Sequence, residues 1–131
     1  MSETGGDATR EVRPGALECD RETRGSAVVL HIRGEVDMVT ADPLGKQLTD
    51  AEALASPPAP VVVDMTGVSF MGSVGLALLL RHRDQCTAQR TPLRLVVSDG
   101  PVLRLLQVSG LSTELDTVAT VDEALNPQPT S

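Results

Sequence analysis

The stretch VVVDMTGVSFMGSVGL, residues 61–76, decides the fold of this chain. Its first three residues are apolar and β-branched, which is typical of a strand that is covered on both faces. A turn is expected at Thr66 and Gly67, followed by the glycine-flanked segment 68–75. A helix then runs to about Arg90, with its apolar residues concentrated in the first turns. A buried strand that leads directly into a helix is a building unit of α/β sheets.

The alternation of strand and helix continues on the N-terminal side of this stretch. Residues 17–22 predict a weak edge strand, and residues 27–33 predict a stronger strand that is closed by Gly34. A helix then begins near Thr40 and is ended by the prolines of residues 56–60. Its apolar positions share one face at helical spacing: Leu44, Leu48, Ala51 and Ala55.

Two further strands and two helices are expected on the C-terminal side. Residues 93–97 predict a strand, and a helix follows from Pro101 at its first position to a left-handed glycine, Gly110. Residues 115–118 predict a last strand, and residues 120–123 have the form of a capping box that opens a short helix. Together these elements predict an α/β fold with a single mixed, mostly parallel β-sheet and helices packed on it.

The length of 131 residues indicates one domain, which we place at residues 15–125. Residues 1–14 are rich in glycine and charged residues without periodicity, and we expect them to be a disordered N-terminal tail. Residues 126–131 predict a disordered C-terminal tail for the same reason.

Composition excludes several classes of function. The net charge of −7 argues against direct nucleic-acid binding, and the absence of Trp and Tyr removes the stacking platforms of single-strand binders. No apolar run reaches the roughly 18–20 residues of a membrane-spanning helix, and the polar N-terminus has no signal-peptide core. We therefore expect a cytoplasmic protein without membrane contact. Cys19 and Cys86 are compatible with a single disulfide, but two buried, reduced thiols are the expectation.

Three segments resemble the STAS family, the anti-sigma factor antagonists and their relatives. Residues 34–37, GEVD, followed by Thr40 and Ala41, look like the family's G-E-L-D motif. Residues 61–76 are similar to its central block, which has D-S-[ST]-G-L at the start of a helix. Residues 93–111 resemble its third segment, so the likeness covers about residues 15–125. The resemblance implies the STAS fold.

The resemblance also implies a function. In the antagonist branch, the first serine of D-S-[ST]-G is phosphorylated by an anti-sigma factor, a serine kinase of the histidine-kinase-like ATPase fold. The unphosphorylated antagonist binds that kinase and frees a sigma factor. By position the phosphoacceptor here is Ser73, but Gly72 and Val74 replace the usual Asp and Ser or Thr. The alternative is a STAS interaction or ligand-sensing module of another signalling assembly, such as a stressosome-like complex, without regulation by phosphorylation. In either case we expect a monomer without a cofactor.

Ser73 carries the expected site. A phosphate is tolerated at a helix N-terminus, where backbone N–H groups and the helix dipole favour negative charge, but at an apolar contact surface it opposes binding. The structural alternative is that Ser73 only caps the helix. Asp37 is expected to organise its turn, and Asp64 to hydrogen-bond loop backbone. The expected partner-contact residues are Glu35, Asp37, Thr40, Met71, Gly72, Ser73, Val74, Gly75 and Leu76.

Catalysis is not expected from this chain. A nucleophile elbow, G-x-S-x-G, would need glycine where Met71 stands. His82 follows Ser73 by nine residues on the same expected helix, too far along the axis at about 1.5 Å per residue. Neither His31 nor His82 belongs to a metal-ligand set, so both are expected to be structural or surface residues.

Overall fold

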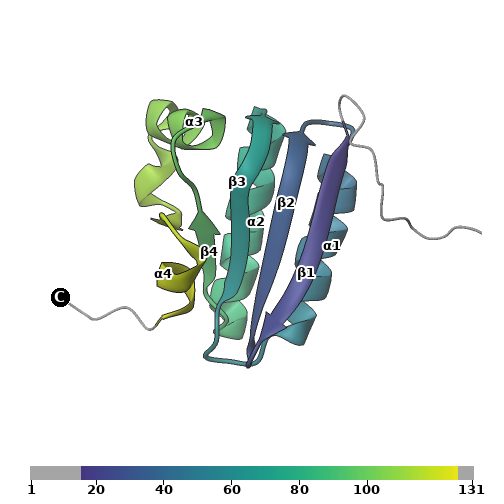
Figure 1. Cartoon of the computed structure of the whole chain (residues 1–131), viewed down its shortest axis with the longest axis vertical. Helices are drawn as coiled ribbons and strands as arrows, with labels where there is room; N and C mark the ends of the chain where they lie inside the picture. Colours follow the sequence, from purple (N-terminus) through teal and green to yellow (C-terminus); the bar gives the residue numbers. More distant parts are fainter. Residues whose placement is uncertain (1–15, 127–131) are drawn as a thin grey trace, which may run out of the picture.

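The computed structural model describes residues 16–126, which form one mixed sheet with helices on both faces (Figure 1). The expected tails lie outside the described residues, apart from Asn126. The sheet has the order β1-β2-β3-β4-β5, with β1 antiparallel to β2 and the other neighbours parallel. In chain order the elements are β1 Leu17–Arg24, β2 Ala27–Val36, α1 Ala41–Leu54, β3 Val61–Met71, α2 Ser73–Gln89, β4 Leu93–Val96, α3 Pro101–Ser109, the 3-10 turn η2 Leu111–Thr113, β5 Asp116–Val118 and α4 Val121–Leu125.

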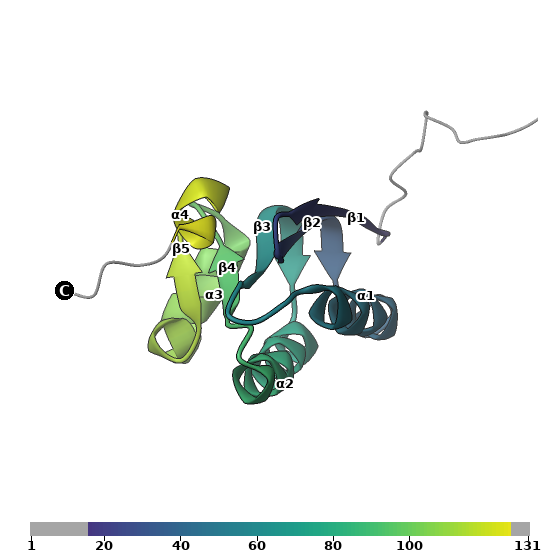
Figure 2. The same cartoon turned by 90° about the horizontal axis from the view of Figure 1, so that it is seen from below.

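The helices divide unequally between the two faces of the sheet. Figure 2 shows α1, α2 and α3 on one side, and α4 alone on the other, over the β4 and β5 end. This follows from the topology, because successive right-handed crossovers between neighbouring parallel strands place their helices on the same face. The other face of β1 and β2 is left to charged side chains, which pair across the strands.

The core is built almost entirely from aliphatic residues. Alternate residues of β2 and β3, including Leu30 and Val63, are fully buried under the three helices. Their neighbours Val29 and Val62 face the other way and pack with Val96 and α4. The prediction that residues 61–63 are covered on both faces is therefore confirmed.

Two expectations for the central strands were wrong. β2 does not close at Gly34 but continues to Val36, and Gly34 lies within the ladder at φ +113°. A Cβ there would lie 2.2 Å from the carbonyl oxygen of Ala16, so the glycine admits the chain that enters β1. Nor is there a turn at Thr66 and Gly67, because β3 is one continuous strand of 11 residues.

β3 absorbs its turn-like residues as bulges. The pairing advances from His31 to Arg33 on β2 while β3 advances from Asp64 to Gly67, so β3 carries one extra residue there. A second shift lies between Gly34 and Glu35. Such bulges bend a strand and increase its twist without breaking it. Gly67 allows β3 to lie close to the Arg33 side chain of β2, because a Cβ at Gly67 would lie 2.6 Å from Cγ of Arg33.

The helix termini agree with the sequence. α1 begins directly after Thr40, and α3 begins with Pro101 and ends at Gly110, which is left-handed at φ +77°. The hydroxyl oxygen of Thr120 accepts a hydrogen bond from the backbone N–H of Glu123 at 3.1 Å, as a capping box requires. Every helix within residues 16–126 is too short or too polar to cross a bilayer.

Both cysteines are free thiols. Cys86 is fully buried on α2, as expected, but Cys19 is only half-buried. Its position on the edge strand β1 explains the difference, because a strand with one neighbour cannot enclose its side chains completely.

Candidate functional site

The candidate site lies at the carboxyl end of the parallel strands, at the top of Figure 1. Here β2 leads into α1 and β3 leads into α2, so the two connections are neighbours. The backbone N–H of Gly72 donates to the carbonyl oxygen of Val36 at 2.9 Å and ties them together. Loops at this end of a parallel sheet are where α/β proteins commonly place binding residues.

Ser73 is exposed at the first residue of α2. Gly72, not Ser73, is the N-cap residue, and it provides no side-chain cap. Across residues 16–126, no hydrogen bond engages the Ser73 hydroxyl. A serine that only capped its helix would accept a hydrogen bond from a backbone N–H of the first turn. The capping interpretation therefore does not describe Ser73.

The turn between β2 and α1 is held by its own side chains. Asp37 Oδ1 accepts hydrogen bonds from the backbone N–H groups of Val39 at 2.9 Å and Thr40 at 3.0 Å. The Thr40 hydroxyl donates to the carbonyl oxygen of Glu35 at 2.8 Å and accepts from the backbone N–H of Asp37 at 2.9 Å. Asp37 therefore organises the turn, as its structural interpretation predicted, while Glu35 is half-buried beside it.

This fixed turn presents apolar side chains to solvent. Met38 is 85% exposed and Val39 is 79% exposed at its tip. Across the junction, Phe70 of β3 is 49% exposed. Four residues, Met38, Val39, Phe70 and Ser73, define what we call the apical surface. A hollow of about 540 Å³ lies within it, lined by Asp37, Met38, Phe70, Gly72, Ser73, Val74 and Ala77. Apolar groups held outward by a hydrogen-bonded turn are typical of a contact surface.

The structure brings the nine expected contact residues to one place, but not all of them to the surface. Met71, Gly75 and Leu76 are buried, and so is Thr40. For these four, the expectation of direct contact needs correction. Met71 ends a strand with its side chain in the core, and Gly75 and Leu76 face inward on the first turn of α2. They position the loop, whereas Glu35, Asp37, Gly72, Ser73 and Val74 are at least partly accessible.

Sequence reasoning missed the exposed apolar residues of the apical surface. From the sequence, no role was expected for Met38 and Val39. They stand in a short connection between a strand and a helix, where polar turn residues are the norm. Two apolar residues in such a connection are the feature of the sequence that could have indicated an exposed apolar contact surface.

The glycine at position 72 is not required by the backbone. Its φ of −88° suits any residue. An added Cβ would meet only the ring of Phe70, at 3.7 and 3.8 Å, and the carbonyl oxygen of Val36 at 3.9 Å. The backbone and the space at the Cβ position therefore admit a side chain, so neither of them requires glycine at position 72.

The two histidines make structural contacts away from Ser73. His31 lies on the open sheet face with Nδ1 2.8 Å from Asp64 Oδ2 and Nε2 2.8 Å from Glu22 Oε1. Partial burial disfavours the charged ring, but the hydrogen bonds to Glu22 and Asp64 outweigh it and raise the pKa of His31. His82 Nδ1 lies 2.5 Å from Glu52 Oε2, and both side chains are buried between α1 and α2.

Asp64 hydrogen-bonds backbone, as the sequence indicated, but it does so within β3 and not in a loop, and it also pairs with His31. Its Oδ1 accepts from the backbone N–H and the hydroxyl of Thr66 at 3.1 and 2.8 Å. Burial works in the opposite direction, yet these bonds and the one to His31 lower the pKa of Asp64. No group of three or more His, Cys, Asp or Glu residues within residues 16–126 could hold a metal ion.

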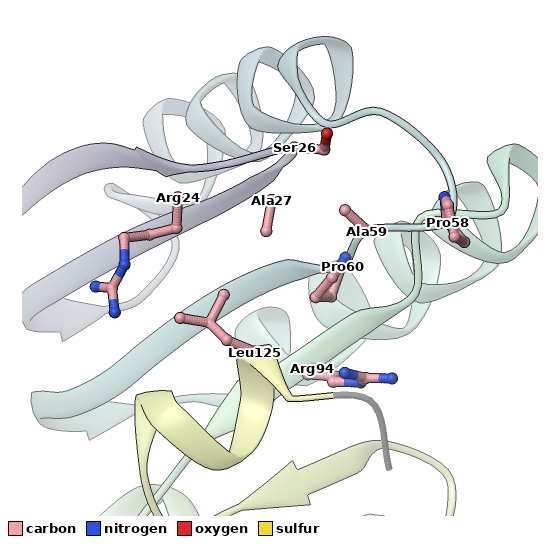
Figure 3. Close-up of a pocket in the computed structure, with 8 residues that line it drawn as sticks. All are labelled: Arg24, Ser26, Ala27, Pro58, Ala59, Pro60, Arg94 and Leu125. Carbon is pink, nitrogen blue, oxygen red and sulfur yellow. The ribbon is translucent and has the colours of Figure 1, made fainter.

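A larger hollow, of about 610 Å³, lies at the opposite end of the sheet (Figure 3). It is bordered by Arg24 and Arg94, whose side chains point away from each other in Figure 3. Arg24 pairs with Glu22 at 3.1 Å, and Arg94 donates to the carbonyl oxygen of Ala124 at 2.7 Å. Both guanidinium groups are thus engaged within the protein, and we do not assign a function to this hollow.

The mixed five-stranded sheet, with an exposed serine where β3 meets α2, is the arrangement of a STAS domain. A model of the STAS domain family matches residues 18–124, and the chain belongs to this family. The anti-sigma-F factor antagonist RsfA of Mycobacterium tuberculosis is 32% identical over 111 residues, covering 85% of this chain and 87% of RsfA. RsfB, an anti-sigma-F factor antagonist of the same organism, is 31% identical over 97 residues, covering 74% of this chain and 77% of RsfB.

Solved structures agree with this assignment. An anti-sigma factor antagonist from Mycobacterium paratuberculosis superimposes with a TM-score of 0.77 at 29% identity, covering 87% of this chain and 95% of that one. The antagonist SpoIIAA in its unphosphorylated form has a TM-score of 0.66 at 22% identity, covering 82% of this chain and 92% of SpoIIAA, and shares the fold. The predictions of family and fold class are confirmed. These relatives are named for antagonism of another protein and not for a reaction, in line with the expected binding role.

Proposed function

We propose that this protein binds an anti-sigma factor through the apical surface and thereby frees a sigma factor, with phosphorylation of Ser73 as the switch. The partner would be a serine kinase of the histidine-kinase-like ATPase fold, met in the cytoplasm by a monomer of this chain. The observation that carries the proposal is the exposed, unbonded hydroxyl of Ser73 within an apolar hollow. The names of the curated relatives supply the class of partner.

The surroundings of Ser73 suit a switch that acts by charge. A phosphoserine carries a charge of about −2 at neutral pH. At the first residue of α2 that charge lies beside free backbone N–H groups, so the fold tolerates it. Against an apolar partner surface the same charge loses its hydration without compensation. Partner affinity should therefore fall more than tenfold, which corresponds to at least about 1.4 kcal/mol.

Titration calorimetry against purified partners tests the proposal. Each anti-sigma factor of the source organism with the histidine-kinase-like ATPase fold is titrated with wild-type protein, Ser73→Ala and Ser73→Asp. Wild type and Ser73→Ala should bind alike, and Ser73→Asp should bind more than tenfold more weakly. Ser56→Asp places the same charge on an exposed serine after α1, at the opposite end of the molecule, and should leave binding unchanged. Failure of the wild type to bind any of these factors would refute the proposal.

Labelled ATP tests the phosphoacceptor separately. The partner kinase should transfer phosphate to the wild-type protein and not to Ser73→Ala. Equal labelling of the two would exclude Ser73 as the acceptor while leaving the binding function intact.

Gly72 and Val74 favour a second candidate, a STAS interaction module that phosphorylation does not regulate. Neither residue supplies the acid or the second hydroxyl that usually flanks the acceptor in this family. Since the Cβ position of residue 72 has room for a side chain, the variant Gly72→Asp distinguishes the two functions. Phosphate transfer that appears only in Gly72→Asp would identify the natural protein as an unregulated binder.

A further inference from the structure

Phe70 separates two hollows in the candidate site. It is the only aromatic residue of the chain and half-exposed at the end of β3. One of its sides borders the hollow that contains Ser73. It also borders a second hollow of about 330 Å³, lined by Phe70, Met71, Pro101, Arg104, Leu105 and Val108. The apolar surface therefore continues from the serine loop onto α3.

The second hollow is open and apolar on the helix side. Val108 is 80% exposed on α3, so its side chain contributes little buried apolar area to the stability of the fold. An aromatic side chain between two depressions has the form of a binding hot spot, which is commonly a large, rigid group surrounded by less critical contacts.

Gly72 leaves the ring of Phe70 uncovered. A Cβ at position 72 would lie 3.7 Å from Cε2 and 3.8 Å from Cζ of the ring, in ordinary contact. Any side chain at position 72 would therefore cover part of this edge. The glycine that replaces the family's acid thus removes a charge and uncovers an apolar contact at the same place.

Arg104 gives the second hollow its charge. It is exposed on α3, and its side chain forms no hydrogen bond or ion pair with any residue between 16 and 126. It is the only cationic residue that lines either of the two hollows. A guanidinium that has no partner among the described residues can form charge-assisted hydrogen bonds with a carboxylate of the bound protein.

We infer that Phe70 is the anchor of partner binding and that the anti-sigma factor places an apolar side chain against it, with a carboxylate next to that side chain for Arg104. This inference rests on the proposed function and extends its contact surface from the Ser73 loop to α3. Specificity then resides in two features beside the serine loop: the aromatic ring that Gly72 leaves uncovered, and Arg104, which has no partner within residues 16–126.

Single substitutions test the anchor and the charge. In calorimetric titrations with the anti-sigma factor that binds wild type, Phe70→Ala and Arg104→Glu should each weaken binding at least tenfold. Leu54→Ala is the matched control for Phe70, because Leu54 is 51% exposed on α1 at the opposite end of the molecule. Arg81→Glu is the control for Arg104, as an exposed arginine on α2 about 12 Å along the helix from Ser73. Both controls should bind like wild type.

Phe70→Trp provides a direct readout of the contact. The chain has no Trp or Tyr, so this variant carries one fluorophore, and a wild-type titration subtracts the partner's own signal. Its emission should shift to shorter wavelength on binding, as the ring leaves water. If Phe70→Ala unfolds, Val108→Ser tests the same hollow from α3 and should also weaken binding.

The outcomes separate this inference from the proposed function. If wild type binds and Phe70→Ala and Arg104→Glu bind equally well, the inference is wrong and the proposed function stands. If no anti-sigma factor binds wild type, both are wrong. A dimer that Phe70→Ala dissolves in size-exclusion chromatography would assign the surface to a second copy of the chain and overturn the inference.

Discussion

Gly72 and Gly75 lie three residues apart at the start of α2 but have opposite surroundings. An added Cβ at Gly72 would make only ordinary van der Waals contact, with a ring carbon of Phe70 nearest at 3.7 Å. Gly75 faces the core, where an added Cβ would lie 2.6 Å from Cγ of Met71 and 2.9 Å from Cγ1 of Val36. One glycine therefore shapes the surface, and the other allows the helix to approach the end of β2.

Substitution should separate these two roles. Gly75→Ala should lower the free energy of unfolding by about 1–3 kcal/mol, because buried Met71 and Val36 must move. Gly72→Ser should leave it unchanged or raise it by a few tenths of a kcal/mol, since serine is a good N-cap residue. Urea unfolding at equilibrium measures both. A stable Gly75→Ala variant would mean that the loop repacks without strain.

The two cysteines should differ in reactivity. Burial and the neighbouring Glu52 carboxylate raise the pKa of Cys86 to about 12, so its reactive thiolate is scarce at neutral pH. Partial burial and Asp20 also raise the pKa of Cys19, but this thiol remains partly accessible. In a timed reaction with a thiol reagent, native Cys19→Ser should label only as fast as the protein unfolds, and native Cys86→Ser should label sooner. Equal rates would contradict this assignment.

At the scale of elements, buried and half-buried hydrogen-bonded pairs of carboxylate and imidazole join the helices and strands. Glu52 of α1 and His82 of α2 form a pair whose side chains are 3% and 5% exposed. Gly45 allows the two helices to approach here, with its Cβ position 3.3 Å from Leu78. On the other face of the sheet, His31 of β2 bridges Glu22 of β1 and Asp64 of β3.

Removing one member of the Glu52–His82 pair should destabilise the protein more than replacing both members with leucine. Glu52→Leu and His82→Leu should each lower the free energy of unfolding by about 2–4 kcal/mol, because each leaves a buried polar partner without its hydrogen bond. The double variant should recover part of this loss. Urea unfolding of the four proteins forms a double-mutant cycle. Additive effects would show that the pair is not coupled.

The bridge at His31 should make stability depend on pH. The pKa of His31 is raised, so its contribution is complete below the ordinary value of 6.5 and is lost as pH rises through the folded-state value. The pKa of Asp64 is lowered, so its contribution is present above 3.8 and is lost as pH falls through the folded-state value. The pKa of Glu22, which also bonds His31, is lowered from its ordinary 4.5, so the bridge is strongest between 4.5 and 6.5, in mildly acidic solution.

His31→Gln should accordingly lose more stability at about pH 5.5 than at about pH 8.5 relative to wild type, as measured by urea unfolding. Arg33→Gln is the control on the same strand, because a guanidinium does not titrate between these values. A His31→Gln deficit that is the same at both pH values would contradict the shifted pKa.

At the scale of the whole molecule, the proposed binding surface and the core lie in different parts of the fold. The core lies between the sheet and three helices, whereas the apical surface lies at the carboxyl ends of β2 and β3. Met38 and Val39 lie almost wholly in solvent and add little to the core. The backbone conformation of Met38 and Val39 is fixed by Asp37 and Thr40, whose hydrogen bonds hold the turn.

Variants of the exposed turn should therefore separate function from stability. Met38→Ser and Val39→Ser should change the free energy of unfolding by no more than about 0.5 kcal/mol, as is usual for surface substitutions. Each should weaken binding of the anti-sigma factor, because less apolar area is buried in the complex. Chemical unfolding and calorimetric titration of the same samples check the two statements. A large loss of stability with unchanged binding would reverse the assignment.

Local patterns were sufficient for much of this molecule. The order of strands and helices, both ends of α3, the start of α4, the doubly covered residues 61–63 and the place of Ser73 at a helix N-terminus followed from residue type and spacing. These features are decided within a few residues, by helix capping, by proline and by hydrophobic period, so a single sequence contains them.

Only the tertiary structure decided the features that depend on distant neighbours. Gly34 and Gly67 resemble turn residues, but their partners Ala16 and Arg33 show that they allow close approach within a continuous sheet. Likewise Met71 is buried and Phe70 exposed, although they are adjacent and both apolar. Alternation along a strand places two neighbours on opposite sides, but which side is covered depends on where the helices pack, and that is set by the whole chain.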